Sequence, residues 1–214
     1  MNDKKITNNN PLKNYGIFLI GLAFVSFGIA FVTKAALGIS PISAIPYSLS
    51  LILPQLSLGN WTIIYSILLI ILQILLLRRN TNKFQVLLQV IISFLFGYII
   101  DFSLWILSAF SPQLYVLRLA SLVLGCAIIA FGVYLELVAG LTLVPGEAFV
   151  RAVAQAAGKE FGTVKVISDT SMALIAAVLC LVFLHELSGV REGTIISALL
   201  LGNIVKIYAR ILKW

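Results

Sequence analysis

Long runs of apolar residues with few charges dominate this chain and leave little room for a soluble fold. The clearest runs extend over residues 61–77, 84–107, 117–135 and 171–184. A helix needs about 20 mostly apolar residues to cross a hydrocarbon core about 30 Å thick, and these runs approach or reach that length. Of the 214 residues, 61% are hydrophobic and 11% are charged, whereas about 25% are charged in soluble domains. The sequence therefore predicts an all-α polytopic membrane protein.

The basic residues gather at the ends of the apolar runs, in a chain with a formal net charge of +7. Loops rich in lysine and arginine stay on the cytoplasmic side of a membrane. A nucleic-acid surface would instead gather the basic residues along one face. We therefore expect a multi-pass protein of the cell membrane with cytoplasmic N- and C-termini and no nucleic-acid partner. The basic clusters are Lys4, Lys5 and Lys13; Arg78, Arg79 and Lys83; and Lys206, Arg210 and Lys213.

A pattern of glycine, phenylalanine and proline in the first half of the chain recurs in the second half. Such a recurrence indicates two homologous halves. We place them at residues 15–107 and 114–213, after a cytoplasmic tail at 1–14, in a single transmembrane domain. The matched pairs are Gly21 and Gly125, Phe27 and Phe131, Gly28 and Gly132, Pro41 and Pro145, and, with one-residue slips, Gly59 and Gly162, and Gly97 and Gly202.

Each half contains one segment that begins with proline and is too short or too polar to cross the membrane comfortably. These segments are residues 41–53 and 145–159. If the first dips into the membrane and returns, the basic N-terminus and the basic loop at 78–83 both lie in the cytoplasm, as the positive-inside rule prefers. We therefore expect six spanning helices and two short re-entrant helices. Three spans per half would invert the second half relative to the first, as in many secondary transporters with inverted repeats.

Ionisable residues inside apolar segments are costly and usually belong to a ligand path or a proton site. Lys165 and Asp169 are one helical turn apart and can pair. By the repeat, Thr62 and Ser66 are their counterparts, so the charges lie mainly in the second half. Four polar residues recur at every fourth position of the second short segment, namely Glu147, Arg151, Gln155 and Lys159.

The two prolines suggest where a solute would bind. Proline suits the first turn of a helix, and a helix that begins within the membrane presents free N–H groups and a positive dipole end to anionic groups. We therefore expect a substrate site between the two short helices, with Glu147 and Asp169 as candidates for proton coupling. The expected site residues are Ser40, Pro41, Ser43, Tyr47, Pro145, Gly146, Glu147, Arg151, Lys165, Asp169, Arg191, Glu192 and Thr194.

Other placements of these charges stay open. The polar stripe of the second short segment could lie on the cytoplasmic surface with its charges solvated, and Asp169 could serve only as an ion-pair partner. Asp101 lies near the outer end of its predicted helix, where we expect it to meet water, and Glu136 lies at a predicted helix end, where we expect it at the membrane interface. No metal, cofactor or enzyme activity is expected, because the chain has one histidine, its two cysteines lie in apolar runs, and no phosphate loop or catalytic set occurs.

Several motifs resemble the YczE/YyaS/YitT group of bacterial membrane proteins. The first-half match is Lys-Ala-Ala-Leu-Gly-Ile-Ser-Pro at 34–41 with Leu-Gly-Asn-Trp-Thr at 58–62. The second-half matches are Pro-Gly-Glu at 145–147, Phe-Gly-Thr-Val-Lys at 161–165, Asp169, and Gly-Val-Arg-Glu-Gly-Thr at 189–194. The resemblance covers nearly the whole chain after residue 14, although Ile42 and Ser43 stand where members often carry Trp-Asp. Because the group is described as permeases, the resemblance implies a permease.

The leading functional hypothesis is a secondary transporter of a small anionic or zwitterionic solute, with proton coupling through one carboxylate. Two alternatives stay open, namely a substrate-capture subunit of an ATP-driven importer and a membrane scaffold that transports nothing. The expected partners are membrane lipids and a small-molecule solute, while a homo-oligomer and partner subunits are left open.

Overall fold

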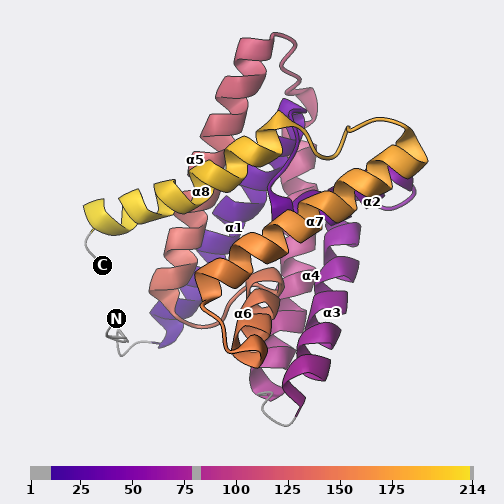
Figure 1. The fold of residues 1–214 in the computed structure, drawn as a ribbon. Coiled ribbons are helices and arrows are strands. Elements are labelled where there is room, and N and C mark those ends of the chain that lie inside the picture. Colours follow the sequence, from indigo (N-terminus) through magenta and orange to yellow (C-terminus); the bar gives the residue numbers. More distant parts are fainter. Residues whose placement is uncertain (1–10, 79–82, 213–214) are drawn as a thin grey trace.

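The computed structural model is all-helical across the residues it describes, 11–78 and 83–212, with no strand among them (Figure 1). The basic residues Lys4, Lys5, Arg79 and Lys213 lie outside the described residues. The helices are α1 (Pro11–Ala35), α2 (Pro41–Ile52), α3 (Leu58–Leu77), α4 (Lys83–Ile106), the 3-10 helix η2 (Leu107–Ala109), α5 (Tyr115–Ala139), α6 (Pro145–Ala157), α7 (Phe161–Leu184) and α8 (Glu192–Ile211).

Six helices in the described part of the chain are long and apolar enough to cross a membrane, namely α1, α3, α4, α5, α7 and α8. This confirms the predicted multi-pass helical character. The other two are shorter, because α2 has 12 residues and α6 has 13, against about 20 for a crossing. Each short helix has its proline in the first turn, where the missing N–H costs no hydrogen bond.

The centre of the bundle is the pair α1 and α5, which cross at close range. A Cβ added to Gly21 would lie 2.8 Å from the carbonyl oxygen of Gly132, and a Cβ added to Gly28 would lie 3.0 Å from that of Gly125. Only glycine allows two backbones to approach so closely. The small residues that the sequence pattern singled out therefore form this contact.

The remaining helices surround this pair. Helix α4 packs on α1, α8 packs on α5, α2 contacts α3 and α7, and α6 contacts the same two helices. Figure 1 shows α3 and α4 side by side, whereas α7 and α8 run obliquely across the other helices. Half of the most apolar stretch of α1 and of α5 is buried, against 17% for α7 and 11% for α8. The apolar side chains exposed on the outer helices suit contact with lipid.

Candidate functional site

A cavity of about 490 Å³ lies where the two short helices begin. Its volume falls in the range of about 300–1,000 Å³ that is usual for small-molecule sites. Most of the wall is apolar. The polar and charged residues on the wall are Ser40, Ser43, Thr62, Tyr65, Ser66, Glu136, Glu147, Lys165, Asp169 and Lys206.

Both short helices direct their first turns at this cavity, since Pro41 and Pro145 line it. Neither helix has a side-chain cap at its N-terminus. The hydroxyl of Ser40, which precedes α2, donates instead to the hydroxyl of Ser43 at 3.3 Å. The first N–H groups of each helix therefore add partial positive charge to the cavity wall.

The two charged residues on α7 form an ion pair at the cavity. The ammonium nitrogen of Lys165 lies 2.9 Å from Oδ1 of Asp169, and the side chains are 26% and 22% exposed. This confirms the pairing expected from their four-residue spacing. The cationic group of Lys165 is therefore already engaged within the protein.

The other two carboxyl groups on the wall, those of Glu136 and Glu147, form no ion pair of this kind among the described residues. Glu136 is 8% exposed, and its Oε1 atom is buried without a hydrogen-bond partner. Glu147 is half-buried on α6, outside the six spanning helices. Burial raises the pKa of the Glu147 carboxyl, Lys165 lowers it, and Asp169 raises it again.

Glu136, like Tyr65 and Lys206, lines the cavity although it was not among the expected site residues. The apolar run in the sequence ends at residue 135, so Glu136 was expected at a helix end near the membrane interface. Helix α5 does end close by, at Ala139, and Gly140 follows with a φ of +61°. The burial of the Glu136 side chain at the cavity was not expected, and the signal that could have found it is an acidic residue four positions before a helix-terminating glycine.

Several residues of the first half lie on the cavity wall together with the residues that match them in the second half. Four such pairs are Pro41 and Pro145, Ser43 and Glu147, Thr62 and Lys165, and Ser66 and Asp169. Two apolar pairs, Val25 with Ile129 and Ile29 with Val133, do the same. The first-half members are neutral and three of their second-half counterparts are charged. Both halves of the chain therefore line the cavity, whereas the charged residues on its wall all belong to the second half.

Eight of the thirteen expected site residues line the cavity, and five do not. Tyr47 packs against the main hydrophobic cluster, and Arg151 is exposed. Thr194 is 3% exposed and lies against Gly38. The polar stripe of α6 is thus divided, with Glu147 at the cavity and Arg151, like Gln155 and Lys159, on the surface.

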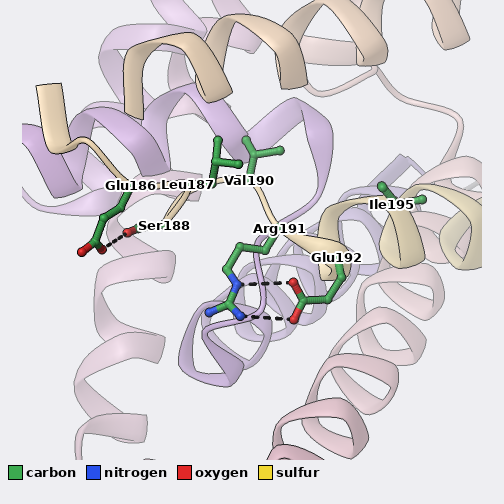
Figure 2. A pocket seen from close by; sticks show the side chains of 7 residues that line it. All are labelled: Glu186, Leu187, Ser188, Val190, Arg191, Glu192 and Ile195. Carbon is green, nitrogen blue, oxygen red and sulfur yellow. Dashed lines mark hydrogen bonds and ion pairs between the residues drawn. The ribbon is translucent and has the colours of Figure 1, made fainter. Parts of the chain in front are cut away.

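Arg191 and Glu192 line a separate hollow on the surface, beside the loop between α7 and α8 (Figure 2). Figure 2 shows their side chains facing each other, with nitrogen–oxygen distances of 3.3 Å. The Arg191 guanidinium also donates to the carbonyl oxygen of Ala36 at 3.4 Å. Arg191 therefore joins the loop to the end of α1, and Glu192 pairs with Arg191.

Asp101 lies away from the cavity and differs from expectation in its partners. Instead of only meeting water, its carboxylate accepts a 2.8 Å hydrogen bond from the backbone N–H of Gly59 and a 2.5 Å bond from the hydroxyl of Ser57. A carboxylate at the start of a helix is stabilised by the free N–H groups and the dipole. Asp101 on α4 therefore caps α3.

A family model described as "Family of unknown function (DUF6198)" matches residues 12–210. The chain belongs to this family. The match takes in all the described helices of the DUF6198 chain except the outermost residues of α1 and α8, and so includes the whole cavity wall. No curated protein and no solved structure matches the chain.

Proposed function

We propose that this DUF6198 protein is a six-span transporter with two inverted repeats, which carries a small anionic or zwitterionic solute through the cavity. The observation that carries the proposal is the position of the cavity. It lies between the uncapped N-termini of two short helices and is lined by repeat-related residues of both halves. Transporters with inverted repeats bind their solutes at such helix ends, at the interface of the repeats.

The packing of the helices supports the repeat. Exchanging the halves turns the contact of α1 with α4 into that of α5 with α8, and the contact of α2 with α7 into that of α6 with α3. It also turns the approach of Gly21 to Gly132 into the approach of Gly125 to Gly28. Each of these counterpart contacts occurs, which is expected of two halves related by an approximate twofold axis.

The lengths of α2 and α6 support re-entrant helices in this proposal, and so does the charge distribution. Both termini and the loop between α3 and α4 would then face the cytoplasm at the cell membrane. The resemblance to the YczE/YyaS/YitT group, with its description as permeases, is part of the same proposal. Proton coupling would use Glu147 or Asp169, which both face the cavity.

Cysteine labelling in a background without native cysteines tests this topology. Gln85→Cys at the start of α4 and Ser111→Cys between α4 and α5 are both exposed. A membrane-impermeant maleimide added to intact cells should label Ser111→Cys, whereas Gln85→Cys and a cysteine next to the N-terminus should react only after permeabilisation. If Gln85→Cys and the N-terminal cysteine react from opposite sides, α2 crosses the membrane and the re-entrant arrangement is wrong.

A further inference from the structure

The cavity contains a carboxyl group with a buried oxygen for which the described residues supply no partner. Oε1 of Glu136 is buried without a hydrogen bond, and the side chain is 8% exposed. Glycine in α1 makes room for it, since a Cβ on Gly21 would lie 3.1 Å from Cγ of Glu136. A buried carboxylate without a partner is strongly unfavourable. A cationic group that enters the cavity would relieve this cost.

The balance of charges on the cavity wall also favours a cationic group. Three carboxyl residues line the cavity, Glu136, Glu147 and Asp169, against two lysines. Lys165 is bonded to Asp169 at 2.9 Å, and Lys206 is exposed to the surroundings. The cavity therefore holds one buried carboxyl group, Glu136, without a basic partner among the described residues, and a second, Glu147, whose pKa the nearby charge of Lys165 lowers.

We propose that the cavity binds the ammonium group of a small zwitterion, with Glu136 as the main counter-ion and Glu147 as the second. This rests on the proposed transport function and selects the zwitterionic class from it. The carboxylate of the same solute would meet the uncapped first turn of α2 beside Ser40 and Ser43. The mainly apolar wall favours a zwitterion with an apolar body, such as an amino acid with a hydrophobic side chain.

Three probes that differ by one charge test this assignment. They are L-phenylalanine, phenethylamine, which lacks the carboxylate, and 3-phenylpropanoate, which lacks the ammonium group. L-Leucine, isoamylamine and 4-methylpentanoate form a second set. A ligand that binds only the folded state raises Tm. We expect a rise of Tm in detergent with at least one amino acid, a smaller rise with its amine, and none with its deaminated acid.

The variants assign the effect to Glu136. Glu136→Gln should keep or raise the ligand-free Tm, because it preserves the shape of the side chain and removes a buried group that has no partner, and it should weaken amino-acid binding at least tenfold. Glu186→Gln, on the exposed loop outside the cavity, should bind like the parent. Three results would each overturn the ammonium site. The first is a rise of Tm with the deaminated acids alone, the second is equal amino-acid binding by Glu136→Gln and the parent, and the third is no rise of Tm with either set of probes. If only the deaminated acids raise Tm, uptake of an anionic solute by proteoliposomes would still support the proposed transport function.

A second inference comes from a difference between the two halves. In the first half, α3 packs on α4 so closely that a Cβ on Gly97 would lie 2.6 Å from the carbonyl oxygen of Gly59. Their counterparts are Gly162 on α7 and Gly202 on α8. A Cβ on Gly202 would meet nothing within 4 Å. The contact of α3 with α4 therefore has no equivalent between α7 and α8.

The residues for such a contact are nevertheless present. Ser57 and Asp101, which bond across α3 and α4 at 2.5 Å, correspond to Glu160 and Lys206 by the same one-residue slips. Glu160 precedes α7 without capping it, Lys206 lines the cavity from α8, and both are exposed. Opposite charges therefore stand where the first half has a hydrogen bond.

We infer that the protein has a second conformation in which α7 and α8 close over the cavity. Gly162 then packs on Gly202, and Glu160 forms an ion pair with Lys206. This rests on the proposed inverted repeat, because each half would adopt in turn the arrangement of the other. Rocking of one repeat against the other is how such transporters expose one site to two sides.

Disulfide formation tests the closure. In a background without Cys126 and Cys180, Gly162→Cys with Gly202→Cys should form a disulfide on mild oxidation in membranes. Gly162→Cys with Asn203→Cys, on the adjacent face of α8, should not. Lys206→Glu should slow the reaction several-fold, and adding Glu160→Lys should restore it. If the first pair stays reduced while each single cysteine reacts with a maleimide, or if both pairs cross-link equally, the closed conformation is excluded.

Discussion

The backbone N–H of Gly59 donates a 2.8 Å hydrogen bond to the carboxylate of Asp101, across 42 residues of sequence. The same carboxylate accepts a bond from Ser57, whose hydroxyl also accepts one from the N–H of Asn60 at 3.1 Å. These bonds join α4 to the first turn of α3. Gly59 and Gly97 allow the two helices to lie close enough for the bonds to form.

Asp101→Ala should therefore destabilise the protein. It removes two hydrogen bonds to a charged acceptor, each worth about 1.5–3 kcal/mol, and we expect a loss of about 2 kcal/mol or more in unfolding free energy. Ser57→Ala also removes two hydrogen bonds, but only one of them involves the carboxylate, so it should cost less. Unfolding of the detergent-purified variants checks this, and an unchanged stability for Asp101→Ala would contradict the capping role.

The central helix pair should tolerate no side chain at Gly28. A Cβ there would lie 2.9 Å from the backbone nitrogen of Ile129 and 3.0 Å from the carbonyl oxygen of Gly125, so Gly28→Ala forces two backbones apart. Overpacking of this kind costs about 1–3 kcal/mol. Gly16 is a matched position on the same helix, with nothing within 4 Å of an added Cβ. Gly16→Ala should leave Tm unchanged or raised, and equal effects at both positions would refute the close approach.

The Lys165–Asp169 pair should respond to substitution as a coupled unit. Asp169→Asn leaves the lysine without its partner in a site where both side chains are about three-quarters buried. We expect a loss of about 1–2 kcal/mol, reduced from the cost of a fully buried pair by partial exposure. Adding Lys165→Met should recover part of the loss in a double-mutant cycle. If the single and double variants are damaged equally, Asp169 acts directly on the solute or the proton.

Glu147 should make stability depend on pH. Burial raises the pKa of its carboxyl above the ordinary value of 4.5, so the folded state binds this proton more tightly than the unfolded state does. The stabilisation is full below the ordinary pKa and is lost as pH rises through the folded-state value. Glu147→Gln should flatten the fall of Tm between pH 5 and 8, whereas Glu186→Gln should not. Identical pH profiles for the parent and Glu147→Gln would place Glu147 in water.

Features set by local sequence could be predicted. The apolar runs at 61–77, 84–107, 117–135 and 171–184 marked α3, α4, α5 and α7, the prolines Pro41 and Pro145 marked the starts of α2 and α6, and the four-residue spacing of Lys165 and Asp169 anticipated their ion pair. Both results follow from the geometry of a single helix. Several pairs of residues that the sequence pattern matches, such as Thr62 with Lys165 and Ser66 with Asp169, also lie on the wall of one cavity.

Features set by distant contacts could not be predicted. The bond between Asp101 and Gly59 depends on how α3 packs on α4, which no local pattern encodes. Glu136 was expected only at a helix end, because the burial of its side chain at the cavity depends on how α1 packs on α5. Arg191 was expected at the site but lies at the end of α1, because its neighbour Glu192 and the carbonyl oxygen of Ala36 both attract it.

The central claim is that the protein alone moves an amine-bearing zwitterion through this cavity. Counterflow in proteoliposomes tests it most directly. The amino acid that gives the largest rise in Tm is placed inside in unlabelled excess and outside in radiolabelled form, with purified parent protein, Glu136→Gln and Glu186→Gln in parallel. We predict accumulation of label by the parent and by Glu186→Gln, and a reduction of at least tenfold in Glu136→Gln. Proteoliposomes that bind the amino acid but accumulate no label would contradict autonomous transport and favour a capture subunit that needs an ATP-driven partner.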